Sequence, residues 1–276
     1  MIPVTSATTL AEAYALLAAR PAGLRVLAGG TDLMVAINAR VGLDRVGHVL
    51  DIWRVGELRG ISLAPATPAA ATETLRIGAL TTYSELVESP LVQERLPALA
   101  AVAREVGALA IQNRGTIGGN VCNASPAGDT LPLLLAADAQ LVVGGPRGER
   151  TIAADQFFVA YRKTALGADE LLLRLEIPLR DRLVYRKVGT RRAQSISRTI
   201  LAVRADPGRK VVRIAAGCVA PVPLRCRRAE TAAVTGGDVR AALEQDIAPI
   251  DDIRGSAEYR REVSGNVLLR LLEELS

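Results

Sequence analysis

Two glycine-rich segments place the tightest limits on how this 276-residue chain can fold. The first covers residues 28–33 (Ala-Gly-Gly-Thr-Asp-Leu), and the second covers residues 115–120 (Gly-Thr-Ile-Gly-Gly-Asn). Glycine lets a backbone adopt positive φ and approach a ligand closely. Successive N–H groups in such turns can also hold an anion. The two segments together therefore predict a site for a ligand with a diphosphate at its centre.

Polar side chains in and near both segments suit the same kind of ligand. The hydroxyls of Thr31 and Thr116 and the amide of Asn120 can donate hydrogen bonds to phosphate oxygens. The helix expected after the first segment would point its N-terminus at that group. Asp32 and Asp129 share the negative charge of a phosphate, so they suit ribose or ribityl hydroxyls, or serve as helix caps.

Neither segment has the spacing of a dinucleotide-binding fingerprint or of a Walker loop, so a Rossmann domain is not indicated. Each segment taken alone is also compatible with a tight turn followed by a helix cap. The prediction of a diphosphate site therefore rests on the presence of both glycine-rich segments.

Composition indicates a globular chain, with 49% apolar and 23% charged residues and room for two modest domains. No uncharged apolar run approaches the roughly 20 residues that span a bilayer. The first nine residues lack the basic and apolar parts of a secretory signal. We therefore expect a cytoplasmic protein.

The net charge of +5 is mild, and its clusters are dispersed. Aromatic residues make up only 3% of the chain, which argues against stacking platforms for nucleic acid. We expect no nucleic-acid partner, and we interpret the basic clusters as solvated faces or protein interfaces. They comprise Arg186, Lys187, Arg191 and Arg192, and a second group of Arg225, Arg227 and Arg228.

The chain offers few residues for metal binding or acid–base catalysis. Cys122, Cys218 and Cys226 are odd in number and widely spaced, which argues against a disulfide framework. Iron–sulfur clusters usually need about four cysteines. The single histidine, His48, lies in a predicted strand at 46–52 and is interpreted as structural. We expect neither a metal site nor a catalytic side chain here.

The first part of the chain reads as a small α/β module. Thr9 and Glu12 form a capping-box pattern before a helix that ends at Pro21. A strand at 25–28 leads into the first glycine segment, and a helix through Val41 follows it.

Further elements follow in the order surface loop, strand, capped helix, longer helix, short helix and two strands. The loop is predicted at 65–74 and the strand at 75–79, and a capping box at Thr82 and Glu85 starts the capped helix. The longer helix is predicted at 91–107 and the short helix at 130–137. The two strands are predicted at 139–144, with a turn at 145–146, and at 171–177.

A domain boundary is predicted at residues 178–182. The FAD-binding domain named below would cover 1–178, with subdomains at about 1–56 and 57–178, and a C-terminal domain would cover 179–276. In the latter, antiparallel strands are expected at 184–189, 200–204 and 211–216, with a turn at 206–208. A final helix from Ser256 should bury a stripe of Tyr259, Val263, Val267, Leu271 and Leu275.

In several stretches the chain resembles the FAD-binding medium subunits of molybdenum hydroxylases. That family includes the flavoprotein subunit of aerobic carbon monoxide dehydrogenase and the flavin domain of xanthine dehydrogenase. The resemblance spans nearly the whole chain in the right order. It is carried by residues 27–33, 77–83, 116–120 with 126–129, 169–172 through 177–178, 187–192, 217–221 and 252–261.

The resemblance implies an α+β fold with two parts. They are a two-subdomain FAD-binding fold of the vanillyl-alcohol-oxidase type and a C-terminal α+β domain with a three-stranded antiparallel sheet and helices. It also implies that Lys187 lies near the isoalloxazine, where its charge would favour the anionic reduced flavin; a solvated cation is the alternative. The implied FAD-binding residues are Ala28, Gly29, Gly30, Thr31, Asp32, Leu33, Thr116, Ile117, Gly118, Gly119, Asn120, Asp129, Leu172 and Lys187.

The implied function is electron transfer inside a complex, which would be a dimer of heterotrimers. A large subunit would carry the molybdenum–pterin cofactor, and a small subunit would carry the [2Fe–2S] clusters that feed FAD. The substrate and the final electron acceptor stay open. Two alternatives remain: a stand-alone FAD-dependent oxidase or dehydrogenase of the same fold, and a scaffold subunit without flavin.

Two positions depart from the family's pattern. Residues 111–113 read Ile-Gln-Asn where Ile-Arg-Asn is frequent, and Ser195 stands where many members have Asp. Gln112 and Ser195 therefore bear on flavin tuning or on partner docking.

Overall fold

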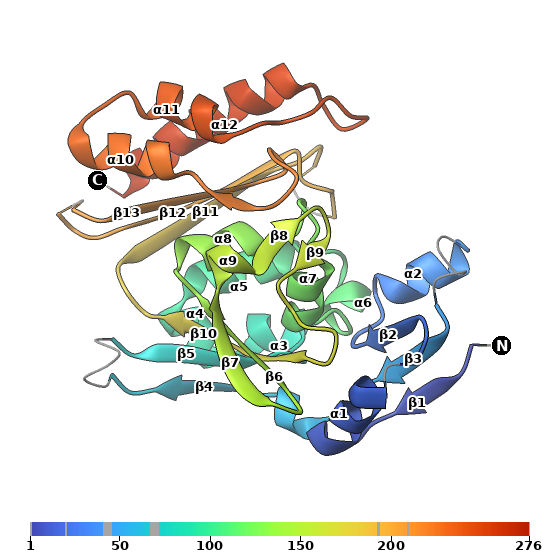
Figure 1. The fold of residues 1–276 in the computed structure, drawn as a ribbon. Coiled ribbons are helices and arrows are strands. Elements are labelled where there is room, and N and C mark those ends of the chain that lie inside the picture. The colour runs from blue at the N-terminus through green and yellow to red at the C-terminus, as the bar shows by residue number, and fades with distance from the viewer. Residues whose placement is uncertain are drawn as a thin grey trace.

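The computed structural model describes residues 2–19, 21–40, 46–66, 72–191, 194–208 and 210–275. These residues form a mixed helix-and-sheet fold (Figure 1). It contains a three-stranded, a five-stranded and a four-stranded sheet, and the two-stranded pair β8 (Phe158–Ala160) and β9 (Lys163–Thr164). No helix in the described ranges combines the length and apolar character needed to cross a membrane.

The first sheet is parallel, in the order β1-β3-β2, and confirms the predicted α/β module. Leu27 pairs with Asp51, so the first glycine segment starts at the edge where β3 also ends. The predicted helix residue Val41 lies outside the described residues. The elements are β1 (Val4–Ser6), α1 (Leu10–Ala19), β2 (Leu24–Leu27), α2 (Leu33–Asn38) and β3 (His48–Asp51).

Local contacts refine two predictions in this module. Thr9 accepts the Glu12 N–H at 3.2 Å, and the Glu12 carboxylate accepts the N–H and the hydroxyl of Thr8 at 2.7 and 2.9 Å. The strongest contacts of this carboxylate thus lie one residue before the position that a capping box predicts. His48 Nε2 lies 2.9 Å from Thr5 Oγ1, which matches its structural interpretation.

The middle sheet is antiparallel, in the order β4-β5-β10-β6-β7, and packs against helices. Its strands are β4 (Ile61–Ala64), β5 (Thr74–Gly78), β6 (Gln140–Gly145), β7 (Gly148–Ala153) and β10 (Leu171–Pro178). A 3₁₀ turn, η2 (Gly56–Leu58), precedes it. Residues 67–71 of the predicted loop at 65–74 lie outside the described ranges.

One helix prediction in this part is wrong. Residues 91–107 form two helices, α4 (Pro90–Arg95) and α5 (Pro97–Glu105), instead of one. Pro97 has no N–H to continue the first helix and disfavours helical geometry at Leu96, whose ψ is +61°. The other helices here are α3 (Tyr83–Glu88), α6 (Leu109–Gln112), α7 (Ile117–Asn123), α8 (Leu131–Ala136) and α9 (Ala154–Phe157).

The C-terminal sheet has four strands, in the order β11-β12-β13-β14, rather than the three expected. The additional strand β14 (Leu224–Arg225) is only two residues long, too short to leave a periodic pattern in the sequence. The remaining elements are β11 (Arg182–Val188), β12 (Thr199–Ala205), β13 (Val212–Gly217), α10 (Arg227–Thr235), α11 (Val239–Asp246) and α12 (Ala257–Glu274).

This sheet lies between two helical layers (Figure 1). Leu201 and Val203 of β12 join the core under α10, α11 and α12, whereas Ala202 between them belongs to the core that includes α8. Successive strand residues point to opposite faces, so one strand can serve both cores.

The predicted stripe on α12 is displaced by one position. Leu271 and Leu275 are buried as expected, but Tyr259, Val263 and Val267 are only partly buried. Arg260 and Ser264 occupy the buried face instead. Arg260 donates through its two terminal nitrogens to the carbonyls of Arg198 and Cys218 and to the Asp252 carboxylate, and Ser264 pairs with Thr199. The Nε atom of Arg260 is buried without a hydrogen-bond partner among the described residues.

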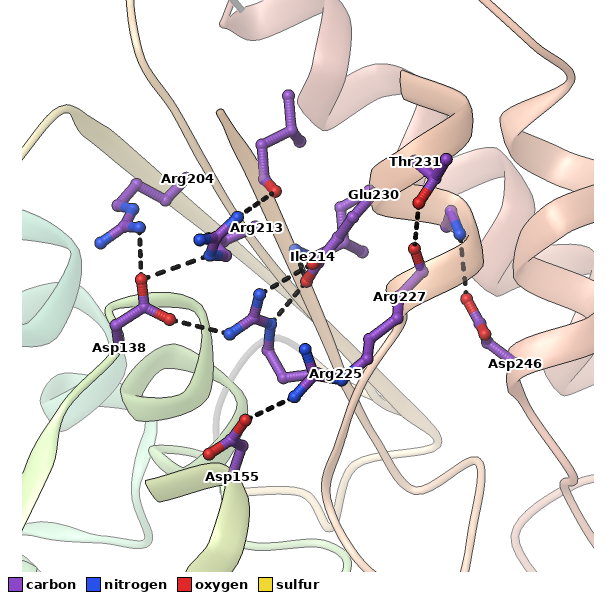
Figure 2. A network of polar contacts seen from close by, with 12 residues as sticks. Asp138, Asp155, Arg204, Arg213, Ile214, Arg225, Arg227, Glu230, Thr231 and Asp246 are labelled. Atoms are coloured by element: carbon purple, nitrogen blue, oxygen red, sulfur yellow. Dashed lines mark hydrogen bonds and ion pairs between the residues drawn. The ribbon is translucent and has the colours of Figure 1, made fainter. Parts of the chain in front are cut away.

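An ionic network joins the middle part of the chain to the C-terminal sheet (Figure 2). The Asp138 carboxylate, just beyond α8, binds Arg204 at 2.6 Å, Arg225 at 2.8 Å and Arg213 at 3.3 Å. Arg225 also binds Glu230 on α10. The side chains of Arg204 and Arg225 are only 3% and 7% exposed. The interpretation of the basic clusters as solvated faces or protein interfaces is therefore wrong for Arg225; Arg192 lies outside the described residues.

Candidate functional site

The first glycine segment connects β2 to α2 and turns sharply at Gly30, whose φ of +80° favours glycine. A Cβ at Gly29 would overlap the carbonyl oxygen of Arg114. The structure thus packs the first segment directly against the residue that precedes the second. Ala28, Thr31 and Leu33 are partly buried, and Asp32 is exposed.

The second segment is the start of a helix rather than a loop. Thr116 is the N-cap of α7, and its hydroxyl oxygen accepts the Gly119 N–H at 3.0 Å. The Gly118 N–H donates to Ala79 O at 2.9 Å, and the Ile117 N–H donates to Thr81 O at 3.0 Å. The expected anion-holding nest is therefore wrong for this segment, because these amides already have protein acceptors.

The two glycines of α7 serve close packing. A Cβ at Gly118 would lie 2.5 Å from the Ala79 carbonyl oxygen. A Cβ at Gly119 would lie 2.8 Å from Thr116 Oγ1 and 4.0 Å from the Ala28 side chain. The missing side chain at Gly119 leaves space between Thr116 and the first glycine segment.

Asp32 links the first segment to α7 through its side chain. Its Oδ1 accepts a hydrogen bond from Asn123 Nδ2 on α7 at 3.0 Å, and Asn123 in turn accepts one from Arg162. Asp32 occupies the N-cap position of α2, but its side chain makes no capping hydrogen bond. The capping alternative for this carboxylate is therefore wrong.

Asn120 points toward buried hydroxyl groups. Its Oδ1 accepts a hydrogen bond from Thr130 Oγ1 at 2.7 Å, and the Tyr83 hydroxyl lies 3.5 Å from the same Thr130 oxygen. Burial raises the pKa of Tyr83 well above its usual value, so the phenol stays neutral. Asn120, in the middle of α7, is thereby held by a polar contact to Thr130, the residue just before α8.

Asp129 and Lys187 form a buried ion pair across the junction to the C-terminal sheet. Lys187 Nζ lies 2.7 Å from Asp129 Oδ2 and also donates to the Glu105 carbonyl, and Ser197 donates to Asp129 Oδ1 at 2.6 Å. The Lys187 side chain is 6% exposed, so the solvated-cation alternative is wrong for this residue, whereas Arg186 and Arg191 of the same cluster are exposed. The carboxylate of Asp129 pairs with Lys187 and Ser197, and α8 makes no side-chain capping bond.

Burial raises the pKa of Asp129, and Lys187 and Ser197 only partly offset that effect. Because the pair is buried, its charges interact more strongly with a neighbouring group than they would in water.

Tyr185 is a further candidate site residue that the sequence did not reveal. Its hydroxyl is buried and has no hydrogen-bond partner among the described residues. Burial, reinforced by the charge of Asp129, raises its pKa well above the usual value. Tyr185 and Lys187 are two residues apart on β11 and so share a face. The two-residue alternation of a strand could therefore have placed Tyr185 beside Lys187 from the sequence. Ser197, which lies outside a regular element, gave none.

Leu172 lies in β10 opposite Val143, just before a register shift. The following residue, Leu173, accepts the Ala79 N–H, and Ala79 accepts the Gly118 N–H, both at 2.9 Å. Leu172 is therefore connected to the start of α7 through two intervening residues, Leu173 and Ala79.

The two departures from the family's pattern make local contacts. Gln112 donates to the Arg104 carbonyl at 3.0 Å, and Ser195 donates to the Arg191 carbonyl at 3.1 Å. Cys122, Cys218 and Cys226 are free thiols, and burial raises the pKa of Cys122 and of Cys218 to about 12. Across the described ranges, no group of three potential ligands is arranged to hold a metal ion.

Comparison with known protein families gives two matches that together cover most of the chain. The family described as the FAD binding domain in molybdopterin dehydrogenase matches residues 1–180. The family described as the CO dehydrogenase flavoprotein C-terminal domain matches residues 184–275.

Individual relatives agree with these matches. The chain is 34% identical over 282 residues to a xanthine dehydrogenase FAD-binding subunit of Escherichia coli O157:H7, covering 97% of this chain and 94% of the relative. It is 33% identical over 276 residues to the carbon monoxide dehydrogenase medium chain of Hydrogenophaga pseudoflava, covering 96% and 93%.

Solved structures show the same likeness in three dimensions. A chain of carbon monoxide dehydrogenase from Hydrogenophaga pseudoflava superposes with a TM-score of 0.87 at 31% identity, covering 98% of this chain and 95% of that one. A chain of quinoline 2-oxidoreductase from Pseudomonas putida 86 gives 0.88 at 25% identity, covering 100% and 96%.

Proposed function

The chain belongs to the family of FAD-binding medium subunits of molybdenum hydroxylases, and on that premise we propose how it takes part in electron transfer. It is an oxidoreductase subunit whose cofactor is FAD. Electrons would arrive from [2Fe–2S] clusters on a small partner subunit, after oxidation of substrate at a molybdenum–pterin centre on a large one. They would leave to an external acceptor.

The residues at the junction of the two glycine segments fit FAD. The space beside Gly119 is bordered by the hydroxyl of Thr116 and by Ala28. On β11, the Tyr185 hydroxyl is buried without a hydrogen-bond partner among the described residues. A buried, unpaired hydroxyl is costly unless a further group bonds to it, so this atom suits a ligand with polar ring atoms.

We assign the diphosphate and its neighbourhood to residues 28–33 and 116–120. Asp129, Leu172 and Lys187 would lie against the flavin or its tail. The observation that carries this assignment is the direct contact of the two segments at Gly29 and Arg114, with the Asp129–Lys187 pair following α7.

Bound FAD supplies two-electron storage with one-electron input. This chain's own part is to bind, to orient and to set the local field. Lys187 brings a positive charge that favours added negative charge nearby, while Asp129 limits that effect. No side chain here is assigned as a general acid or base.

We also propose that the chain divides into a FAD-binding domain at 1–178, with subdomains at about 1–56 and 57–178, and a C-terminal domain at 179–276. The separate sheets and the two family matches support this division. The vanillyl-alcohol-oxidase type of fold is proposed for the first domain. The assembly would be a dimer of heterotrimers, and three free thiols fit a cytoplasmic location.

The test is the visible absorption spectrum of the natively purified protein with whatever accompanies it. Flavin bands overlaid on iron–sulfur absorption, with two additional polypeptides, are expected. Flavin on the isolated chain, with partners rigorously excluded, would favour a stand-alone oxidoreductase. A colourless chain that FAD cannot reconstitute would refute both.

A further inference from the structure

The only tryptophan of the chain, Trp53, shares a neighbour with the first glycine segment. It follows β3 by two residues, and β3 pairs with β2, the strand that leads into that segment, as far as Asp51 and Leu27. The guanidinium group of Arg114 packs on the Trp53 ring, and the carbonyl oxygen of Arg114 lies against Gly29. Arg114 therefore connects the indole ring to the segment assigned to the diphosphate.

Two guanidinium groups pack on this ring. The Cζ atom of Arg114 lies 3.8 Å from the ring centroid, and that of Arg59 lies 4.5 Å from it. Both distances are within the range of attractive cation–π contacts, and planar guanidinium groups stack well on aromatic faces. Trp53 thus holds two positive charges close together.

The two arginines differ in their other contacts. Arg59 donates to the carbonyls of Leu80 and Trp53, and Glu85 lies 3.9 Å away. Arg114 is exposed and has no carboxylate partner in the part of the chain that the structure describes. No carboxylate of the described residues therefore neutralises its charge.

The position of Arg114 is as informative as its charge. Its carbonyl group packs against Gly29, and Gly115 and Thr116 follow it directly. The amides of Ile117, Gly118 and Gly119 are already bonded to protein oxygens. A dianionic group at this junction would need a cation, and Arg114 is a cation already ordered there by an aromatic ring.

We propose that Arg114, held by Trp53, is a binding residue that supplies the positive charge for the diphosphate of FAD. This inference rests on the proposed FAD site. The stacking limits the conformational freedom that a long side chain would otherwise lose on binding. Arg59 adds to the same positive field and is a positioning residue through Trp53.

The test is equilibrium dialysis of the flavin-free full-length chain against FAD, at low and at high salt. Arg114→Gln should weaken FAD binding about tenfold at low salt, a typical loss for one charge-assisted contact. Arg114→Glu should weaken it further because it reverses the charge. High salt should reduce the differences in FAD affinity between the wild type and these variants, since ions screen an exposed charge.

Arg270→Gln is the matched control, because it removes one exposed positive charge from α12 and should leave the affinity unchanged. Wild-type affinity in Arg114→Gln would overturn the inference, as would equal losses for the Gln and Glu variants or an equal loss in the control. If the wild-type chain itself bound no FAD, the proposed function would fail instead.

Discussion

The Asp138 network provides the most direct test of how the C-terminal sheet is attached. Asp138→Asn keeps the size of the side chain while removing its charge. It also keeps a residue that tolerates the positive φ of +53° at this position. The change leaves Arg204 and Arg225 buried without the carboxylate that they share.

The expected cost follows from burial and remaining partners. Removing one member of a buried ion pair costs about 3–5 kcal/mol. Here the Asp138 side chain is 27% exposed, and Arg225 retains Glu230 at 2.7 Å, which reduces the loss. We expect the free energy of unfolding to fall by about 2–3 kcal/mol, equivalent to about 5–10 °C in melting temperature.

Asp155→Asn is the matched control. Asp155 also binds an arginine of the C-terminal part, Arg227, at 2.6 Å, but that arginine is 67% exposed. Exposed pairs contribute about 0–1 kcal/mol. Thermal and urea unfolding should therefore separate the two variants clearly. Equal losses in both, or no loss in Asp138→Asn, would refute the argument from burial.

Acid should act on the same network. Burial alone would raise the pKa of Asp138, but the charges of Arg204 and Arg225 outweigh it and hold the pKa below its usual value. A carboxyl group with a lowered folded pKa adds stability above its unfolded pKa of about 3.9, and that stability is lost as pH falls through the folded value. The difference between wild type and Asp138→Asn should therefore shrink below about pH 4.

Three further variants test the proposed FAD site. Lys187→Ala should retain FAD but lower its reduction potential, measured by spectroelectrochemistry; an unchanged potential would separate Lys187 from the flavin. Gly119→Val should give a folded protein without flavin, with folding judged by circular dichroism and flavin content by absorbance. The new side chain also requires Thr116 to shift. Full flavin content would contradict our placement of α7 at the FAD site. Tyr185→Phe should raise the free energy of unfolding of the flavin-free chain by about 1 kcal/mol, and with it the melting temperature, because it removes an unpaired buried hydroxyl. A loss of stability would reveal a partner for that hydroxyl.

The sequence was most informative where local chemistry determines structure. The capping box at Thr82 and Glu85 is present with both hydrogen bonds, because it depends on residues three apart. The hairpin before β13 is also local: Asp206 and Val211 bond to each other. Such features need no knowledge of the rest of the chain.

Predictions failed where distant segments decide the outcome. The glycines of α7 looked like an anion-binding loop, yet Gly118 is required by the approach of Ala79, about 40 residues earlier in the chain. Arg260 and Ser264 were not part of the stripe predicted for α12, and their buried partners lie on β12 and in the segments that border β12 and β13. A helical pattern cannot show acceptors that another strand supplies.

The short helix α8 connects these observations. Asp129 precedes it and binds Lys187, while Asp138 follows it and binds the arginines of the C-terminal sheet. All six residues of α8 are buried, so it has little freedom to shift between its two anchors. A change at Asp138 should therefore be transmitted to the Asp129–Lys187 pair as well as to stability. In the complex with FAD, Asp138→Asn should alter the reduction potential, whereas Asp155→Asn should not, because its exposed partner lies on α10 rather than beside α8.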